Sequence, residues 1–292
     1  MKEKRVNFYF MLHLLFVILS LFSCSFKNDN KTKFSIMTWN VYLNKGDSNA
    51  CLNVLNDYKS DFYIFQEAND SFYENVLNPF MNELNNSNYE LINTIVESKT
   101  CYMPIIYNSN SWDVMENEVQ PLVDRYETAR GKTLSYGVFI NKEDETIVSI
   151  INYHGVKCLA SYKGYENYTN TELEKIENQW HIGNVNQGLQ LIENLKDKYG
   201  DHPIIFGGDC NFNSSEEPYL ILKTNDYISG QELFEDEYKT THILGENPIK
   251  GLSIDHLFVD KLVDIYEYKK IVTSNTLIAS DHIPIYAILG IE

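Results

Sequence analysis

The hydrophobic pattern of this chain consists of short apolar runs that each stop at a polar side chain. The runs at 34–40, 61–67 and 103–108 predict buried strands. The runs at 134–141 and 146–153 flank a charged tetrapeptide and predict a β-hairpin. Because ligands bind at the carboxyl ends of strands in open α/β sheets, the polar residues at these ends are candidate site residues.

The second half of the chain contains the most informative of these runs. We expect residues 204–206 to form a short strand that enters a turn at Gly207-Gly208. This turn would deliver Asp209 and Asn211, two positions apart, to the same side. An acid and an amide at the end of a buried strand suit metal or phosphate chemistry.

Amphipathic segments and further strands fill the rest of the chain. Helices are predicted at 48–58, 71–84 and 218–222, and one or two helices within 173–199. Further strands are predicted at 89–96, 253–259 and 283–289, and strand and loop at 112–123. No internal repeat and no low-complexity linker follow residue 33, so we expect residues 34–292 to form one domain.

The N-terminus has the pattern of an export signal. Three basic residues precede the apolar run 8–22, which is shorter than the about 20 residues of a membrane-spanning helix. The sequence that ends this run resembles a bacterial lipoprotein box, so we predict a signal peptide at 1–23 and a lipid on Cys24. Residues 24–33 would then be a tether to the membrane of the cell envelope. An ordinary secretory signal peptide and an uncleaved anchor are the alternatives.

The composition permits a full hydrophobic core but opposes tight non-specific binding to nucleic acid. Apolar residues make up 43% of the chain and the formal net charge is −17. Removal of residues 1–23 takes away three bases and one acid, which gives −17 − 2 = −19. Bound divalent cations would reverse the sign locally at a site.

Four cysteines remain after Cys24, namely Cys51, Cys101, Cys158 and Cys210. They allow three pairings, and the sequence does not choose among them. No C-x-x-C is present, so their spacing fits no zinc signature. We expect Cys210 to be a small buried residue.

The polar residues at the ends of apolar strands form a set rich in oxygen ligands. The set is Asn40, Glu67, Tyr107, His154, Asp209, Asn211, Asp255, Asp281 and His282. Hard oxygen donors favour Mg²⁺, with Mn²⁺ or Ca²⁺ as alternatives, over structural zinc. No G-x-S-x-G elbow, Walker loop or G-x-G-x-x-G is found, so a serine hydrolase, an NTPase and a dinucleotide oxidoreductase are disfavoured.

This ordered series of strand ends resembles the endonuclease/exonuclease/phosphatase superfamily, which includes DNase I-like nucleases. The motifs that carry the resemblance are Thr38-Trp39-Asn40, Gln66-Glu67, Ile106-Tyr107, Tyr153-His154-Gly155, Gly208-Asp209-Cys210-Asn211, Ile254-Asp255-His256 and Ser280-Asp281-His282. Each motif is weak alone, but their order along residues 34–289 is specific. The resemblance implies a four-layer α/β sandwich, in which two packed, mostly antiparallel sheets are flanked by helices.

The resemblance also implies a role for each residue. Glu67 would be the principal metal ligand, with Asn40 and Asp281 as helpers. Asp209 and Asn211 would position the attacking water, and His282, oriented by Asp255, would contact the phosphate and act as base. His154 and Tyr107 would stabilise the charge that develops on the phosphate.

Simpler structural roles remain open for several of these residues. Tyr107 would also be explained by core packing, since the chain has 21 tyrosines. Asn40 would also be explained as a turn cap, and His154 as a structural histidine. The pair Thr241-His242, in the loop before Asp255, either helps to choose the substrate or is simply surface loop.

The functional hypothesis is therefore a Mg²⁺-dependent phosphoester hydrolase, in the first place a phosphodiesterase. Its substrate would be a small molecule, a lipid head group or a nucleic acid, and we expect a monomer. An extracellular DNase of the same fold is one alternative. A non-catalytic envelope lipoprotein that uses the fold for binding is the alternative of another class.

Overall fold

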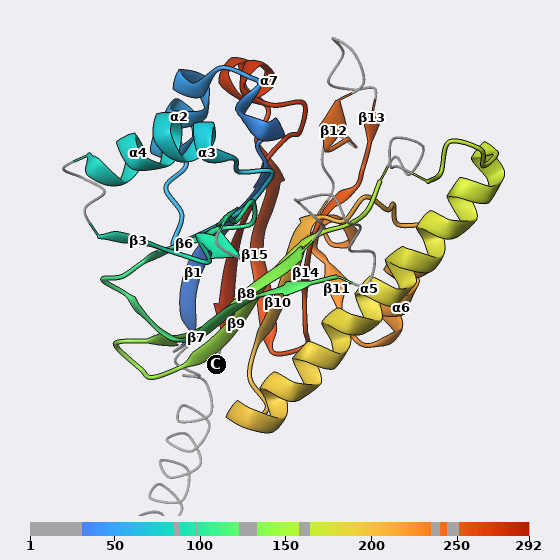
Figure 1. Cartoon of the computed structure of the whole chain (residues 1–292). Coiled ribbons are helices and arrows are strands. Elements are labelled where there is room, and N and C mark those ends of the chain that lie inside the picture. The colour runs from blue at the N-terminus through green and yellow to red at the C-terminus, as the bar shows by residue number, and fades with distance from the viewer. Residues whose placement is uncertain are drawn as a thin grey trace, which may run out of the picture.

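Two six-stranded β-sheets pack face to face and are flanked by helices on both outer faces (Figure 1). The computed structural model describes residues 31–83, 88–96, 99–122, 133–157, 164–234, 240–243 and 251–291. The predicted signal peptide, Cys24 with its predicted lipid, and Cys158 lie outside the described residues.

The first sheet is built around the N-terminal strand. Its strand order is β15 (Val263–Lys270), β16 (Ile285–Ile291), β1 (Thr32–Asn40), β2 (Phe62–Gln66), β6 (Ile105–Asn108) and β3 (Tyr89–Ile92). Only β1 and β2 are parallel, and the other pairs are antiparallel. β1 begins at Thr32, two residues before the predicted start.

The second sheet has the same mixture of strand directions. Its order is β11 (Ile228–Ser229), β14 (Asp255–Val259), β10 (Ile204–Asp209), β9 (Ile147–His154), β8 (Thr133–Asn141) and β7 (Trp112–Pro121). Only β9 and β10 are parallel. Two small pairs lie outside the main sheets, β4 (Ile95–Val96) with β5 (Lys99–Thr100) and β12 (His242–Ile243) with β13 (Gly251–Leu252). The predicted hairpin of β8 and β9 and the mostly antiparallel sheets are confirmed.

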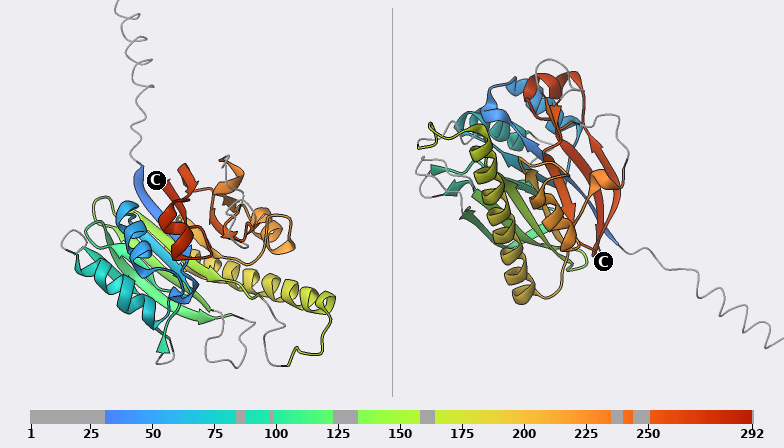
Figure 2. Two further views of the ribbon diagram at one scale, coloured as in Figure 1. Left: turned by 90° about the horizontal axis from the view of Figure 1, so that it is seen from above. Right: turned by 90° about the vertical axis from the view of Figure 1, so that its right-hand side faces the viewer.

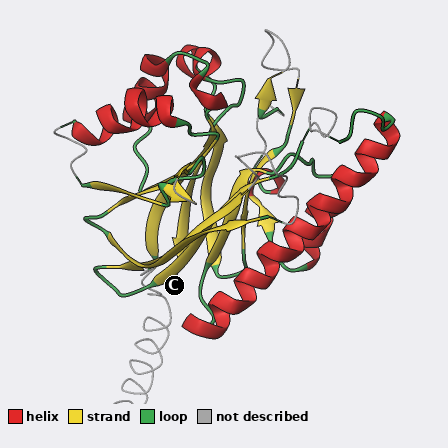
Figure 3. Cartoon of the chain, viewed as in Figure 1, coloured by secondary structure: helices red, strands yellow, loops and turns green. Residues whose placement is uncertain are grey.

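Helices form the two outer layers (Figures 2 and 3). Those on the first sheet are α2 (Ser48–Asp57), α3 (Asp70–Phe72), the π-helical η2 (Tyr73–Leu77), α4 (Asn78–Asn82) and α7 (Ser274–Ala279), with the short η1 (Tyr42–Asn44) after β1. Those on the second sheet are α5 (Asn170–Tyr199) and α6 (Glu217–Thr224), followed by η5 (Gly230–Glu232). Among the described residues, no helix combines the length and apolar character that crossing a bilayer requires.

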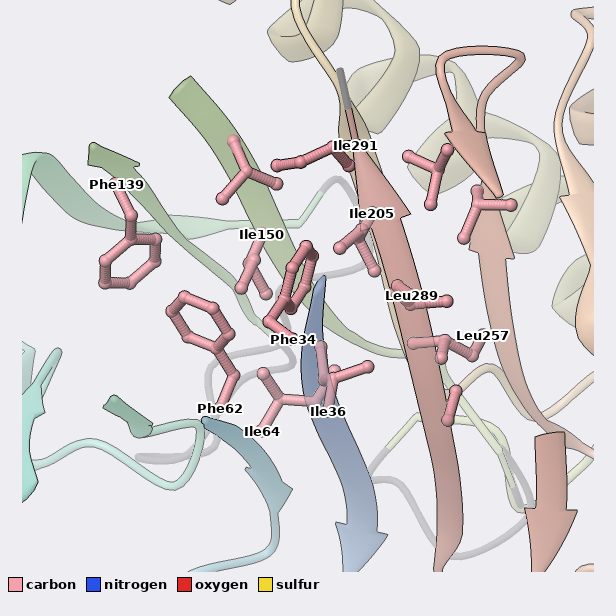
Figure 4. Close-up of a cluster of buried hydrophobic side chains, with 14 of the residues drawn as sticks. Phe34, Ile36, Phe62, Ile64, Phe139, Ile150, Ile205, Leu257, Leu289 and Ile291 are labelled. Atoms are coloured by element: carbon pink, nitrogen blue, oxygen red, sulfur yellow. The ribbon is translucent and has the colours of Figure 1, made fainter. Parts of the chain in front are cut away.

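The main hydrophobic core lies between the two sheets. Phe34 and Phe62 of the first sheet meet Phe139 and Ile150 of the second in this core (Figure 4). Two further apolar clusters join each sheet to its own helices. Because both faces of each sheet are covered, the central strands are buried along most of their length and are mostly apolar rather than alternating.

Three predicted elements differ from the structure. The predicted strand 89–96 stops at Ile92, because the φ of 59° at Asn93 lies outside the β region of backbone conformations. The predicted helix 71–84 is interrupted by the π-helical segment η2. The glycine pair Gly207-Gly208 lies within β10 instead of forming a turn, since both residues pair with β9 and β14.

The cysteines within the described residues are free thiols. Cys51, Cys101 and Cys210 are all buried, and none of them forms a disulfide. The expectation of a buried Cys210 is confirmed.

Candidate active site

The ends of the two parallel strand pairs meet at one edge of the sandwich. Asn40, His154 and Asp209 are the last residues of β1, β9 and β10, and Glu67 follows β2 directly. These four candidate residues lie at strand ends, as the sequence predicted.

The remaining acidic and histidine residues come from the starts of strands, which corrects the sequence-based placement. Asp255 is the first residue of β14 and pairs with Asp209, because β14 runs antiparallel to β10. Asp281 and His282 likewise precede β16, which is antiparallel to β1. The start of an antiparallel strand lies beside the end of its neighbour, so both kinds of position reach the same edge.

Asp209 lies at the centre of this cluster and is 2% exposed. The Nδ2 of Asn40 donates a hydrogen bond to Asp209 Oδ2 at 2.9 Å. The Nε2 atoms of His154 and His282 lie 3.4 Å and 3.8 Å from the same oxygen. One carboxylate oxygen thus meets an amide and two imidazoles in a buried setting.

His282 is oriented by a second carboxylate. Its Nδ1 lies 2.9 Å from Asp255 Oδ2, so Nδ1 carries the donated proton and Nε2 faces Asp209 and Asp281. Burial raises the pKa of Asp255. Burial favours the neutral form of His282, but the carboxylates of Asp255, Asp209 and Asp281 outweigh this and raise its pKa to about 9.

The end of β1 and the segment before β16 hold each other in place. Ser280 Oγ donates to the carbonyl of Asn40 at 2.7 Å and accepts from the backbone N–H of His282 at 3.0 Å. The indole N–H of Trp39 donates to the carbonyl of His282 at 2.9 Å. These bonds fix His282 relative to the strand that supplies Asn40.

Glu67 takes a backbone conformation that few non-glycine residues adopt, with a φ of 58°. Its Oε1 lies 3.8 Å from Nε2 of His154, and a quarter of its side chain (26%) is exposed. Glu67 therefore lies on the open side of the cluster, beside His154.

A buried amide pair under Glu67 joins the two sheets. Gln66 Nε2 donates to Asn152 Oδ1 at 2.8 Å, and Asn152 Nδ2 donates to the carbonyl of Phe65 at 2.8 Å. This pair sets the distance between the ends of β2 and β9. Asn152 was not among the predicted site residues, although a polar residue inside a mostly apolar strand was a usable signal.

Asn211 lies beside Asp209, and its side chain is held by the backbone of Gly155. Its backbone N–H donates to Asp209 Oδ1 at 3.1 Å, and its Nδ2 donates to the carbonyl of Gly155 at 3.1 Å. Gly155 in turn donates its N–H to the carbonyl of Asp209 at 2.9 Å. The residues after β9 and β10 thus form one hydrogen-bonded unit.

Tyr107 is not brought to the site, so its assignment to the phosphate was wrong. It pairs with Phe62 at the start of β2, whereas the site lies beyond the other end of that strand at Glu67. Its hydroxyl donates to Glu90 at 2.6 Å and its ring packs on Phe139 in the core. Core packing, the alternative considered for this residue, accounts for its position.

The pair Thr241-His242 lies at the site and is not simply surface loop. Thr241 is fully buried, and its Oγ1 accepts hydrogen bonds from the N–H groups of Ile254 and Asp255, both at 3.0 Å. The ring of His242 lies 4.6 Å from the ring of His282. Thr241 therefore supports Asp255, and His242 adds a third imidazole to the cluster.

The donor set fits a divalent cation. Four carboxylates converge here with three imidazoles, those of Glu67, Asp209, Asp255 and Asp281 with His154, His242 and His282. Oδ1 of Asp281 is buried and has no hydrogen-bond partner among the described residues, which is costly unless a cation binds there. Carboxylate and amide oxygens of this kind suit hard cations.

The family follows from comparison with known proteins. The sequence model of the Endonuclease/Exonuclease/phosphatase family matches residues 37–282, which span every motif of the site. The chain belongs to this family. No curated protein matches the chain. Members of the endonuclease/exonuclease/phosphatase family hydrolyse phosphoesters, and the family match supports that general activity here.

Solved structures of endonuclease/exonuclease/phosphatase proteins share the fold. An endonuclease/exonuclease/phosphatase from Bacteroides vulgatus superposes with a TM-score of 0.68 at 16% identity, over 90% of this chain and 100% of that one. A mannosyl-6-phosphatase from Bacteroides thetaiotaomicron gives 0.64 at 15% identity, over 88% and 99%. D. rerio TDP2, complexed with a single-strand DNA product, gives 0.62 at 16% identity, over 88% and 99%. The predicted four-layer sandwich is confirmed.

Proposed function

We propose that the protein is a Mg²⁺-dependent phosphoester hydrolase that acts in the first place on phosphodiesters, with Mn²⁺ or Ca²⁺ as alternative ions. The observation that carries this proposal is the buried Asp209 carboxylate between Asn40, His154 and His282. Burial of a carboxylate is costly unless the group is paired or has a chemical role. The amide and imidazoles around Asp209 are groups that can position reactants and stabilise charge in phosphoryl transfer.

The cation would be held by Glu67, Asn40 and Asp281. Glu67 and Asp281 offer partly exposed carboxylates, with 26% and 31% of their side chains exposed. When bound, the ion would polarise a phosphoryl oxygen and lower the pKa of a bound water.

The other residues would act on the water and on the phosphate. Asp209 would orient the attacking water and accept its proton, with Asn211 beside it. Nε2 of His282 faces this position, and Asp255 keeps it in one orientation through Nδ1. His154, between Glu67 and Asp209, would donate a hydrogen bond to the phosphoryl oxygens.

A DNase of the same fold is the second candidate. It is favoured by the similarity to D. rerio TDP2, whose structure contains a single-strand DNA product. The net charge of −17 weighs against tight binding to a polyanion. We therefore place small phosphodiesters first and DNA second.

A metal-supplemented screen tests the proposal. The full-length protein would be assayed on a small phosphodiester, a phosphate monoester, plasmid DNA, RNA and a phospholipid head group, with Mg²⁺ and with EDTA. We expect Mg²⁺-dependent turnover that Glu67→Gln and His282→Ala each reduce by about 10²-fold or more.

A matched control separates this loss from general damage. Glu145 also has a positive φ, 63°, but it is exposed and lies before the start of β9, whereas His154 lies at the end of that strand. Glu145→Gln should therefore keep full activity. EDTA-resistant hydrolysis, or full activity in Glu67→Gln, would refute the proposed mechanism. Absence of turnover on every substrate would favour a non-catalytic binding protein.

A further inference from the structure

His242 belongs to a short element that is fastened directly to the site. The backbone N–H of Ile243 donates to the carbonyl of Asp281 at 2.7 Å, and that of Ile283 donates to the carbonyl of Thr241 at 2.7 Å. These two bonds form an antiparallel bridge between His242 and His282. The position of His242 beside Asp281 and His282 is therefore set by the backbone.

The side chains at this bridge converge on one point. His242 Nε2 lies 3.7 Å from Asp281 Oδ2, and His282 Nε2 lies 3.9 Å from Asp281 Oδ1. One donor atom from each of the three residues lies within 4.8 Å of the other two. Ligand atoms that share a zinc ion lie about 3 Å apart, so shifts of less than about 1 Å would bring all three onto one ion.

The surroundings of these donors are those of metal ligands. His282 gives its other nitrogen, Nδ1, to Asp255 at 2.9 Å, which is the carboxylate–histidine arrangement typical of histidines that bind metals. Asp281 Oδ1 is buried without a hydrogen-bond partner among the described residues. The side chain of His242 is 16% exposed, which leaves the point open to solvent ions.

We propose that His242, Asp281 and His282 form a second cation site, selective for borderline ions such as Zn²⁺ over Mg²⁺. Two imidazoles and one carboxylate favour first-row transition metals, whereas Glu67 and Asn40 offer only oxygen. The two sites share Asp281, and His242 is the residue that distinguishes them.

Occupancy of this site would withdraw His282 from the phosphate. Nε2 of His282 cannot bind Zn²⁺ and contact a phosphoryl oxygen at the same time, so Zn²⁺ would inhibit hydrolysis. This consequence rests on the proposed function, whereas binding of the ion does not.

Binding of Zn²⁺ to the full-length protein, without substrate, tests the site. In isothermal titration calorimetry, the wild type should bind Zn²⁺, and His242→Gln should weaken that binding by at least about tenfold. The matched variant is Glu67→Gln, which leaves all three donors of the second site in place and should bind Zn²⁺ as the wild type does. Co²⁺ supplies a spectroscopic readout, because its visible absorption should change on loss of the His242 imidazole but not in Glu67→Gln.

The outcomes separate the two proposals. Equal Zn²⁺ affinity in the wild type and in His242→Gln would overturn the second site, as would loss of binding in Glu67→Gln alone or no Zn²⁺ binding to the wild type. NMR spectra of the wild-type imidazoles give a check that needs no variant, since Zn²⁺ should shift His242 and His282 together and leave His202 unchanged. None of these measurements depends on finding a hydrolysed substrate.

Discussion

At the scale of single residues, His256 shows how a histidine one position from the site serves packing instead of chemistry. Its ring is fully buried and stacks on Phe212. Its Nε2 lies 2.8 Å from the carbonyl of Phe212, and its Nδ1 lies 3.1 Å from Nε2 of Gln231. Both ring nitrogens therefore have a hydrogen-bond partner when the ring is neutral. Burial lowers the pKa of His256 to about 4.

This burial predicts a specific dependence of stability on pH. The pKa of His256 is lower in the folded protein than its ordinary value of 6.5, so the unfolded chain binds the extra proton first as the pH falls. The stabilisation is complete above about pH 6.5 and is lost as the pH falls to about 4, a total of about 3 kcal/mol. His256→Gln removes this titration. In urea unfolding, the stability of the wild type minus that of His256→Gln should rise by about 3 kcal/mol between pH 4 and 6.5. A constant or falling difference would contradict the burial of a neutral ring.

The sequence pointed to the charged residues and to Asn40 and Asn211, but it misplaced Tyr107 and did not single out Asn152. Asp209 and His282 stand out because ionisable groups beside apolar strands are costly unless they have a use. Tyr107 does not stand out in this way, because a buried phenol hydroxyl is satisfied by one hydrogen-bond partner, which Glu90 provides. Asn152 is polar within a mostly apolar strand, which was a usable signal, but its partner Gln66 comes from the other sheet, so the sequence did not reveal the bond between them.

At the scale of elements, β10 carries the central carboxylate because two glycines let it pass between β9 and β14. Gly208 adopts a φ of 138°, and a Cβ there would lie 2.0 Å from the carbonyl oxygen of Tyr153. A Cβ on Gly207 would lie 2.8 Å from Leu257 Cδ1. The glycines are needed for close approach inside a sheet, and this brings Asp209 to its position beside His154.

Gly208→Ala should therefore be far more damaging than an alanine at another left-handed glycine. Gly200 also has a positive φ, 84°, but nothing lies within 4 Å of a Cβ placed on it. Gly200→Ala should cost about 1–3 kcal/mol of stability, from backbone conformation alone, since Gly200 combines a φ of 84° with a ψ of 179°. Gly208→Ala adds a clash with backbone and should cost about 4 kcal/mol or more, or prevent folding. Thermal and denaturant unfolding of both variants measures this, and equal costs would show that β10 tolerates a side chain at Gly208.

Sequence periodicity located most elements but not their interruptions. The strands were predictable because runs such as 147–154 are mostly apolar, as expected of strands that are buried on both faces. The break at Asn93 was not, since it depends on a hydrogen bond from Asn93 Nδ2 to the carbonyl of Tyr136, 43 residues away. The glycines of β10 were assigned to a turn because glycine has the same local preference in a turn and in a tight crossing.

At the scale of the whole molecule, the candidate site and the N-terminal start of the described chain lie at opposite ends of β1. The strand begins at Thr32, so the last two residues of the predicted tether 24–33 belong to β1, and it ends at Asn40 in the site. Nine strand residues span about 30 Å at about 3.3 Å each. If a lipid on Cys24 holds the protein to a membrane, we expect the site to lie at the end of β1 that is farther from that surface.

This geometry predicts that anchoring does not direct the enzyme to lipids of its own bilayer. The full-length protein bound to liposomes and the Cys24→Ser form in solution should hydrolyse a soluble phosphodiester with equal kcat/KM. Head-group phosphodiesters in the same liposomes should be hydrolysed no faster by the bound form than by the free form, because about 30 Å of protein separates them from Asp209. A large advantage of the bound form on these lipids would show that the tether lets the protein reorient so that its site faces the bilayer. The lipid head group would then be the leading substrate. Equal rates would favour a soluble phosphoester that reaches the site from the side away from the membrane.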